Sequence, residues 1–475
     1  MITKQHILER AAEWRLRPDV VEKDYVLGWL LVGIAQHAEL REHWVFKGGT
    51  CLKKCYFETY RFSEDLDFSL TPSALYSADE LLRQLKELAR HVNEVSGIEL
   101  PEGSIVVEAK RNKQGQPTFR ARIGYRGPLA VPTLPRVLLD LTQNEVIAAA
   151  PTSRPIFHPY PDDLPEDALV SAYSIEELFA EKTRALHERM RPRDLYDVVH
   201  LVENYSGAVD FASARAIFRA KCAAKGIATP SSDALVAQVL GSTELEADWK
   251  EMLAHQLPAL PPLDGIRSRV VASLAWIDEP VVSPPTPPPV SPARVSIIPA
   301  PASLGHIPAS PEQQIIAPAG GTFWGSAGPL ELVRFAGSNR LMITFSYHGK
   351  PRTAEPYSLR RAGTGNLLLY AWEEEDGHVK AFKVPEMSGL AVTENTFVPR
   401  YLIELNAIGS TIRSRPRQSD SSPGRAASGP TYVFQCPYCH KTFRRNRNDP
   451  GLRAHKRPDG IVECPGRQGY LVRTK

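Results

Sequence analysis

The stretch that decides the fold is VFKGGTCLKKCYFETYRFSEDLDFSL, residues 45–70. A short apolar run ends at the glycine pair Gly48-Gly49, and a second apolar run contains two acids, Asp65 and Asp67. Residues i and i+2 of a strand point to the same side, so the two carboxylates would stand together. Two close like charges are costly without a positive group between them, so the pattern indicates a metal site.

The alternative to a metal site is a solvated acidic turn. Ser63 and Glu64 fit such a turn, but Asp65 and Asp67 fit it poorly, because the chain continues apolar and a glycine turn lies upstream. Carboxylate pairs bind Mg²⁺ (or Mn²⁺), which bridges the phosphates of an NTP. The pair therefore favours the chemistry of phosphoryl or nucleotidyl transfer.

The glycine turn itself suits a triphosphate. A glycine turn at the start of a helix lets backbone N–H groups approach phosphate oxygens. Thr50 follows the turn and adds a hydroxyl, and Lys47 or Lys53 could add positive charge.

A third carboxylate and a distant lysine could complete the site. Asp140 interrupts the apolar run of RVLLDLTQNE, residues 136–145, and burying such an acid without a partner is costly. Lys182 lies in EELFAEKTRALHER, residues 176–189, and helical spacing places it on the apolar stripe with Leu178. It either contacts a phosphate or buries its stem and extends its ammonium to water.

These segments together resemble the AbiEii-type nucleotidyltransferase toxins of abortive-infection toxin–antitoxin systems. The superfamily signature is Gly-Gly-Ser/Thr, a spacer and Asp-x-Asp, and the other motifs follow in the family's order over about residues 15–205. The matching segments are EKDYVLGWLL (22–31), FKGGTCLKK (46–54), RFSEDLDF (61–68), LLDLTQNE (138–145), EELFAEKTRALHER (176–189) and RDLYDVVHL (193–201).

The resemblance implies a mixed α/β (α+β) minimal nucleotidyltransferase fold followed by a helical region. It implies that the glycine turn holds the triphosphate, that the Asp-x-Asp pair holds Mg²⁺, and that the helix lysine belongs to the active site. The triphosphate residues are Gly48, Gly49 and Thr50, the Mg²⁺ ligands are Asp65 and Asp67 with Asp140 as a third candidate, and the helix lysine is Lys182. Lys53 is a candidate nucleotide-binding residue from its position after the turn.

Three further acids have structural interpretations beside functional ones. Asp194 and Asp197 lie three residues apart on one helix face, where we expect them mainly to orient the helix of Lys182. Asp24, in the EKDY segment, either closes the site or forms a helix salt bridge.

The charge is unevenly distributed along the chain. The net charge is only +3, but residues 411–475 contain 14 Lys and Arg against 4 Asp and Glu, which makes the tail +10 and the remaining 410 residues −7. A basic tail on a mildly acidic body points to a nucleic-acid or phosphate partner, and the alternative is a disordered solubilising tail.

The length of 475 residues predicts several domains. Twelve of the 39 residues from 280 to 318 are proline, which predicts an extended linker rather than a helix or sheet. The predicted parts are a nucleotidyltransferase domain with a helical end (1–275), a Pro-rich linker (276–322), a small β-barrel-like domain (323–408), a polar linker (409–430) and a zinc module (431–475).

The predicted β domain weakly resembles WYL-type domains, which are small SH3-like barrels that often sense ligands or nucleic acid. The resemblance rests on ITFSYHGKPRTAEPYSL (343–359), NLLLYAW (366–372) and FVPR (397–400). The alternative is a structural spacer.

Four residues of the tail have the types and the spacing of zinc ligands. Cys436 and Cys439 form a C-x2-C pair, and His455 and Cys464 follow it. His440 is an alternative ligand with poor geometry, because it is adjacent to Cys439. A segment of about 40 residues has little core of its own, so a bound metal would let it fold. We therefore expect a structural Zn²⁺ finger.

These features lead to an Mg²⁺-dependent transferase that moves a nucleoside monophosphate from an NTP to an acceptor, with RNA such as tRNA as the expected acceptor. The resemblance implies a toxin role in phage defence or growth arrest, and a separate antitoxin protein as a partner. The alternatives are a non-catalytic nucleic-acid-binding regulator and an enzyme that modifies a protein hydroxyl. The charged N-terminus lacks a signal sequence and no apolar run is long enough to span a bilayer, so we expect a cytoplasmic protein without a membrane partner.

Overall fold

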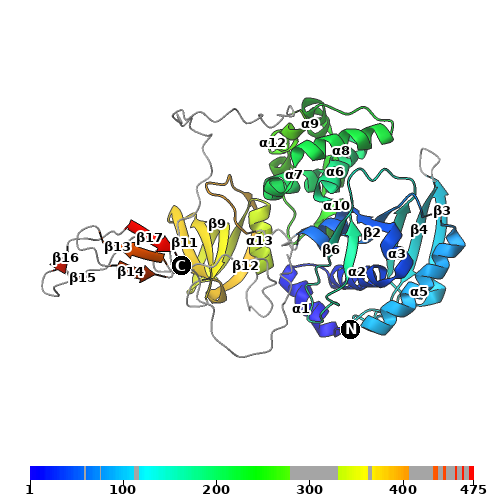
Figure 1. Cartoon of the computed structure of the whole chain (residues 1–475), viewed down its shortest axis with the longest axis horizontal. Helices are drawn as coiled ribbons and strands as arrows, with labels where there is room; N and C mark the ends of the chain where they lie inside the picture. The colour runs from blue at the N-terminus through cyan, green and yellow to red at the C-terminus, as the bar shows by residue number, and fades with distance from the viewer. Residues whose placement is uncertain are drawn as a thin grey trace. The chain divides into compact units, whose positions relative to one another are not determined.

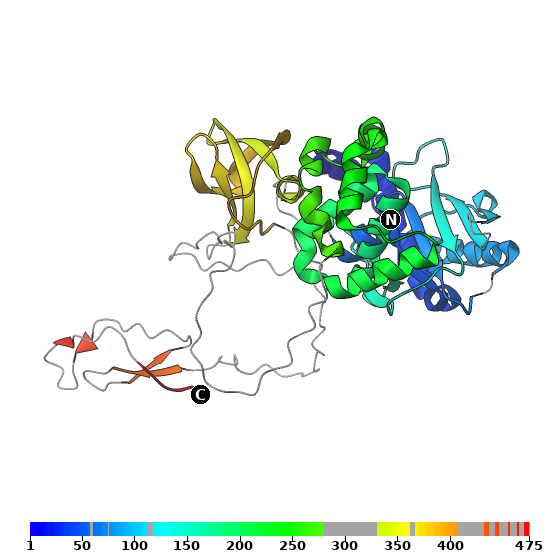
Figure 2. The ribbon, with the colours of Figure 1, turned by 90° about the horizontal axis from the view of Figure 1, so that it is seen from above.

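The computed structural model describes most of the chain, in two separate units, Met1–Ser410 and Thr411–Lys475 (Figures 1 and 2). None of the helices in the described part combines the length and the apolar character that a membrane crossing needs. The described ranges are 1–57, 60–74, 76–111, 117–278, 330–361, 366–405, 432–436, 442–445, 455–456, 463–464 and 470–474.

A seven-stranded mixed sheet forms the centre of the first part of the chain (Figure 1). The strand order is β3-β4-β5-β2-β1-β7-β6, in which β2 pairs with β5, and β1 with β7, in parallel. The strands are β1 (Trp44–Lys47), β2 (Asp65–Leu70), β3 (Val106–Arg111), β4 (Pro117–Gly124), β5 (Arg136–Thr142), β6 (Thr152–Pro155) and β7 (Leu169–Ala172).

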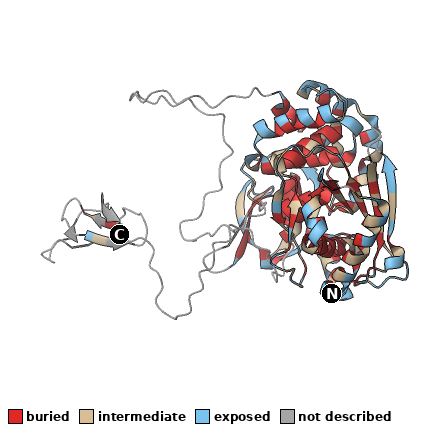
Figure 3. Ribbon diagram, turned by 45° about the vertical axis from the view of Figure 1, so that its right-hand side comes forward, coloured by how far each residue is buried: buried red, intermediate tan, exposed pale blue. Residues whose placement is uncertain are grey.

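The two faces of this sheet differ in polarity because side chains alternate along each strand. On β5 the apolar Val137, Leu139 and Leu141 are buried, while Arg136 and Asp140 lie on the opposite face. Figure 3 shows the buried residues gathered where the helices cover the sheet. The alternation predicted strands at β3, β4 and β5, and the structure confirms them.

Helices cover the sheet, with α2 and α5 on one side and a group from α6 to α12 on another (Figure 1). Ser77 caps α5 and Ser174 caps α6 by accepting the backbone N–H three residues on, which confirms the predicted capping pattern at Ser174. The helices are α1 (Lys4–Trp14), α2 (Pro18–Gln36), α3 (Ala38–His43), α4 (Gly48–Cys51), α5 (Ala78–Ser96), α6 (Ile175–Arg189), α7 (Pro192–Tyr205), α8 (Phe211–Ala224), α9 (Ser232–Gly241), α10 (Thr243–Leu253), α11 (Leu263–Arg267) and α12 (Val270–Leu274).

The segment between the glycine pair and β2 departs from a regular helix. After the single turn of α4, Leu52–Tyr56 form a π-helix, in which Cys55 is buried. Cys51 and Cys55 are both buried free thiols, as their spacing predicted. A π-turn widens the helix and often lies beside a functional site.

The middle of the chain contains one helix and a five-stranded antiparallel sheet, ordered β11-β10-β9-β8-β12. The end strands β11 and β12 do not pair with each other in the described residues, so barrel-like closure stays a prediction. Helix α13 is an element that the sequence pattern does not predict, and HVKAFKVPEMSGLAV forms two strands rather than one. The elements are α13 (Leu330–Ser338), β8 (Leu341–Tyr347), β9 (Lys350–Arg361), β10 (Leu367–Glu373), β11 (His378–Lys383) and β12 (Met387–Thr396).

The C-terminal unit contains two small antiparallel sheets. Strand β13 lies between β14 and β17, and β15 pairs with β16. The strands are β13 (Tyr432–Gln435), β14 (Thr442–Arg445), β15 (His455–Lys456), β16 (Glu463–Cys464) and β17 (Tyr470–Thr474). The prolines of the predicted first linker lie outside the described residues, and Trp276 at its predicted start is buried. The division into five parts stays a prediction.

Candidate active site

A row of five charged side chains crosses five strands on the polar face of the first sheet. Lys47 on β1 is the Cα partner of Asp67 on β2, and Asp67 is the partner of Asp140 on β5. Asp140 pairs with Arg120 on β4, which pairs with Glu108 on β3. Neighbouring strands lie about 4.8 Å apart, so the structure brings together Asp67 and Asp140, 73 positions apart in the sequence.

The glycine pair allows the backbone to pass close to this row. Gly48 has φ +80°, a left-handed conformation that residues with a Cβ rarely adopt, and a Cβ there would lie 2.3 Å from Asp67 Oδ2. A Cβ on Gly49 would lie 2.6 Å from Arg61 Nη2. Both glycines are therefore needed so that the turn can approach the carboxylate and the guanidinium. The predicted approach of this turn to a triphosphate stays a prediction.

Among the described residues, Asp67 forms no ion pair of its own. Burial raises the pKa of Asp67 to about 6, and the charges of Asp140 and Asp65 add to this effect. The nearest cations are Lys47 and Lys182. Lys47 is paired with Glu145, and Lys182 lies 2.8 Å from another carboxylate, so neither is committed to Asp67.

Asp65 lies two residues before Asp67 on the same strand and is half-buried. Burial and the charge of Glu64 raise the pKa of Asp65. Glu64 is itself paired with Lys23 at 2.8 Å and with His255 at 3.2 Å. The two carboxylates of the Asp-x-Asp pair therefore need a further positive group.

Lys182 belongs to a buried ion network on α6 and α7. Its ammonium lies 2.8 Å from Asp197 and 3.7 Å from Asp194. Arg61 donates two hydrogen bonds to Asp197, at 2.6 and 2.7 Å, and a third to Gln256. Burial disfavours the charge of Asp197, but the two cations outweigh it and hold the pKa of that carboxyl well below its usual range. The acids thus orient Lys182, as predicted.

The other predicted residues have partners within the protein. Asp140 accepts two hydrogen bonds from Arg120, at 2.7 and 3.0 Å. The Thr50 hydroxyl donates to the Asp65 carbonyl at 2.5 Å, which ties α4 to β2. The Lys53 ammonium lies 4.5 Å from the centre of the Phe62 ring, a cation–π arrangement. In this structure Thr50 and Lys53 support the turn rather than face the carboxylates.

Asp24 forms neither a helix salt bridge nor a part of the charged row. Its carboxylate lies 2.6 Å from the ammonium of Lys54, and both side chains are fully buried. Tyr160 donates a further hydrogen bond to Asp24. This pair connects α2 to the π-helix. The ion pair at Asp24 therefore joins two helices, and the expectation of a salt bridge within one helix is wrong.

Sequence reasoning missed Arg61 and Glu145 near the carboxylates, and it expected Arg193 to pair with a nearby acid. Arg61 and Glu145 stand inside quoted motifs, but their partners lie more than 75 residues away, so no local pattern reveals them. Arg193 is half-buried, and among the described residues its guanidinium has no hydrogen bond or ion pair. Burial and the charge of Arg61 lower the pKa of Arg193, although Asp65 opposes the effect. Arg193 is thus an uncommitted cation beside the Asp-x-Asp pair.

The Asp-x-Asp pair fits a Mg²⁺ ion. Within the described ranges, no three His, Cys, Asp or Glu side chains form a metal-binding group, and Asp140 is bonded to Arg120. Mg²⁺ keeps several waters and commonly uses one or two carboxylates together with substrate phosphates. Asp65 and Asp67 supply two such carboxylates, and burial and the neighbouring acids raise the pKa of both.

Of the four predicted zinc ligands, Cys439 lies outside the described ranges. Cys436 is buried. His455 and Cys464 are Cα partners across β15 and β16, so the backbone brings these two predicted ligands opposite each other. The zinc site stays a prediction.

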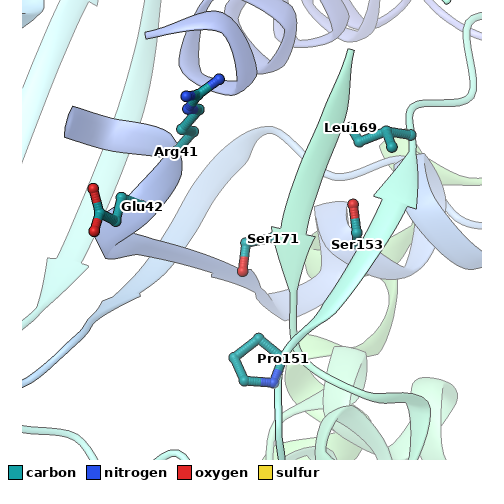
Figure 4. Close-up of a pocket in the computed structure, with 6 residues that line it drawn as sticks. All are labelled: Arg41, Glu42, Pro151, Ser153, Leu169 and Ser171. Carbon is teal, nitrogen blue, oxygen red and sulfur yellow. The ribbon is translucent and has the colours of Figure 1, made fainter. Parts of the chain in front are cut away.

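A pocket of about 470 Å³ lies elsewhere, beside α3 and the strands β6 and β7 (Figure 4). It contains none of the predicted site residues, and it has no cluster of carboxylates. The charged row is therefore the better candidate site. The residues that line the pocket are Arg41, Glu42, Pro151, Ser153, Leu169 and Ser171.

A mixed sheet that carries an Asp-x-Asp pair beside a glycine turn, with the backbone of the turn close to the carboxylates, is typical of nucleotidyltransferases. The family described as the nucleotidyl transferase AbiEii toxin, type IV toxin–antitoxin system, matches residues 29–277, more than half of the chain. The chain belongs to this family, and it is a nucleotidyltransferase of the toxin–antitoxin type.

Two solved structures resemble the chain more distantly. MenT4, a nucleotidyltransferase toxin of Mycobacterium tuberculosis, is 20% identical and has a TM-score of 0.42, covering 59% of this chain and 91% of its own. The proteasome accessory factor B/C (PafBC) of Arthrobacter aurescens is 15% identical and has a TM-score of 0.15, covering 36% of this chain and 24% of its own. No curated protein matches the chain. Both structural similarities are weak, and the family assignment rests on the family match.

Proposed function

We propose that this chain transfers a nucleoside monophosphate from an NTP to a hydroxyl group of an RNA, such as a tRNA, and releases pyrophosphate. The observation that carries the proposal is the Asp65–Asp67 pair, which lacks a committed counter-ion and lies against the close-approach turn at Gly48. Two such carboxylates beside a phosphate-sized turn suit an NTP that arrives with Mg²⁺.

The residues have distinct roles in this proposal. Asp65 and Asp67 hold Mg²⁺ (or Mn²⁺), which when bound neutralises the phosphates and stabilises the in-line displacement. Gly48 and Gly49 allow backbone N–H groups to approach the triphosphate. Lys182 lies near enough to Asp67 to lower the pKa of that carboxyl, and from there it contacts a phosphate of the NTP.

Three further residues act around the carboxylate pair. Arg193 is an uncommitted cation beside Asp65 and joins Lys182 in neutralising the triphosphate. Thr50 and Lys53 act through the shape of the turn, because Thr50 is bonded to the Asp65 carbonyl and Lys53 lies over Phe62.

The chemical step balances with one proton transfer. The acceptor hydroxyl oxygen bonds to the α-phosphorus of the NTP, and the bond from that phosphorus to the β-phosphate bridging oxygen breaks. The hydroxyl proton passes to Asp140, which sits next to Asp67 and accepts hydrogen bonds from Arg120 in the resting state. Pyrophosphate leaves with its electron pair on the bridging oxygen.

The test compares the full chain with Asp67→Asn, using each α-³²P-labelled NTP in turn with total cellular RNA. The wild-type chain labels RNA, the label is lost on RNase digestion, and Asp67→Asn lowers labelling by at least about a hundredfold. Label that resists RNase and is lost on protease digestion would identify a protein acceptor. Equal RNA labelling by the variant would overturn the role of the carboxylate pair.

We propose the wider role on the same basis. The family supports a toxin that arrests growth, in phage defence, under control of an antitoxin protein. The β domain acts as a WYL-like ligand-sensing module. The tail, with a charge of +10, binds Zn²⁺ through Cys436, Cys439, His455 and Cys464 and contacts nucleic acid.

A further inference from the structure

The polar face of the sheet continues beyond the carboxylates over β5, β4 and β3. The register places Arg122 beside Leu138, one step from the row that contains Asp140 and Arg120. Lys110 on β3 lies opposite Thr118 on β4, one step to the other side. The opposite face of β4 and β5 is buried, so this open face is the direct lateral extension of the candidate site.

The face is rich in exposed cations. The side chains of Arg120, Arg122 and Lys110 are 40%, 35% and 45% exposed. Arg136 is exposed at the start of β5 and points to the same side as Asp140. Only two acids share the face among the described residues of these strands: Asp140, held by Arg120, and Glu108, which pairs with Arg122 at 2.6 Å and with Lys110 at 3.3 Å.

The opposite end of the charged row is closed. Lys47 and Glu145 are each only 8% exposed, and they form a buried ion pair beside β1. A long acceptor therefore reaches the carboxylates from the β3 side and cannot continue past β1. This asymmetry favours an acceptor that presents a chain end rather than the middle of a strand.

We propose that the exposed face of β3, β4 and β5 binds the sugar–phosphate backbone of a single-stranded RNA and delivers its terminal hydroxyl to Asp140. The inference rests on the proposed transfer reaction and names the surface that its acceptor uses. Arg122, Arg136 and Lys110 contact successive phosphates, and Arg120 exchanges Asp140 for the phosphate nearest the reacting end.

The chemistry of the face selects RNA over a protein acceptor. Protein interfaces have cores that are depleted of charge and enriched in aromatic side chains. This face instead presents four cations, with Thr118, Thr142 and Leu138 between them and no aromatic residue on its strands at these positions. Arginine and lysine on an open surface are the usual ligands of nucleic-acid phosphates.

The experiment uses the full chain with the double substitution Arg122→Gln and Arg136→Gln. Neither residue contacts Asp65, Asp67 or Asp140 in the described structure. The control is Arg83→Gln with Arg90→Gln, which removes the same charge from exposed positions on α5, across the sheet. Transfer from a labelled NTP to a synthetic single-stranded RNA of about 20 nucleotides gives separate KM values for RNA and for NTP. Fluorescence anisotropy with the same RNA gives the binding constant as a function of salt.

The face variant should raise the KM for RNA about tenfold and leave the KM for NTP within twofold of wild type. Two lost phosphate contacts should reduce the slope of log K against log salt by about 1.4. The control should match wild type, and an RNA that ends in a 3′-phosphate should bind normally but accept no label. Label on that blocked RNA would overturn delivery of the terminal hydroxyl.

The two proposals fail in different ways. If wild type labels RNA and the face variant behaves like the control in both assays, the face is not the acceptor surface although the reaction stands. If RNA binding depends on the face but no RNA is labelled, the proposed reaction is wrong and the binding surface stands. Labelling of protein alone would overturn both.

Discussion

At the scale of single residues, the charge of Asp67 lowers the stability of the fold and is the feature that the proposed chemistry needs. Its carboxylate is partly buried beside Asp140 and Asp65, and the nearby cations Lys47 and Lys182 are paired with other acids. A charge in that position destabilises the folded chain until a positive group arrives. In the proposed reaction the same imbalance favours the binding of a metal ion.

The first prediction concerns the stability of Asp67→Asn. The folded pKa of about 6 lies above the ordinary value of 3.8, so the contribution of Asp67 to folding is fully present below about pH 4 and is lost as pH rises through 6. At pH 8 the variant should therefore be more stable than wild type, by up to about 3 kcal/mol, and at pH 4 the two should be alike. Thermal unfolding across this pH range measures the difference.

Asp167→Asn is the matched control for this prediction, because Asp167 is an exposed loop acid. It should shift stability by less than about 0.5 kcal/mol at every pH. A less stable Asp67→Asn at pH 8 would show that the carboxylate is already compensated within the protein.

At the scale of elements, helices α6 and α7 together hold an ion network beside the candidate site. Lys182 on α6 and Arg61, which precedes β2, share the single carboxylate of Asp197 on α7. One acid thus holds two cations in place. Substitution of one cation should therefore change the stability of the fold by a different amount from substitution of the acid.

The second prediction separates these two changes. Asp197→Asn leaves Arg61 and Lys182 buried without their shared charge and should cost about 3–5 kcal/mol of unfolding free energy. Lys182→Met keeps the two bonds from Arg61 to Asp197, so its stability cost should stay below about 2 kcal/mol while transfer falls at least about tenfold. Urea unfolding and the labelling assay measure the two quantities. Equal destabilisation by both variants would contradict the distinction.

The sequence predicted the local parts of the fold and missed the distant pairings. Alternating patterns and caps located β2, β5 and α6, since each depends on neighbours within a few residues. The partner of Arg61 lies 136 residues away, and the bond between Arg120 and Asp140 depends on strand register, which no local pattern contains. Helix α13 has only nine residues and follows a proline-rich segment, so its apolar spacing gives little signal.

At the scale of the whole molecule, the C-terminal unit differs from the rest in size and in charge. It has two small sheets, and its only described buried residues are Val433 and Cys436. A segment of about 40 residues rarely has enough core for stability by itself, which is why a metal is expected there.

The third prediction is that the full chain contains one zinc ion, measured by mass spectrometry after exhaustive dialysis. Cys464→Ser should lower the zinc content from about one to below about 0.2 per chain, because a tetrahedral site needs all four ligands. Cys222→Ala, at a buried free thiol of α8, is the control and should retain the metal. A zinc content unaffected by Cys464→Ser would remove that residue from the ligand set.

The bonds of Arg61 also bear on how such enzymes can be recombined. Arg61 reaches Asp197 and the side chain of Gln256, 195 residues further along the chain. A shortened chain that ends before Gln256 would remove one partner of the buried guanidinium, and a chimera that joins this sheet to foreign helices would remove both. The first sheet and the helices after it would therefore have to be kept together in such a chimera, whatever modules are attached downstream.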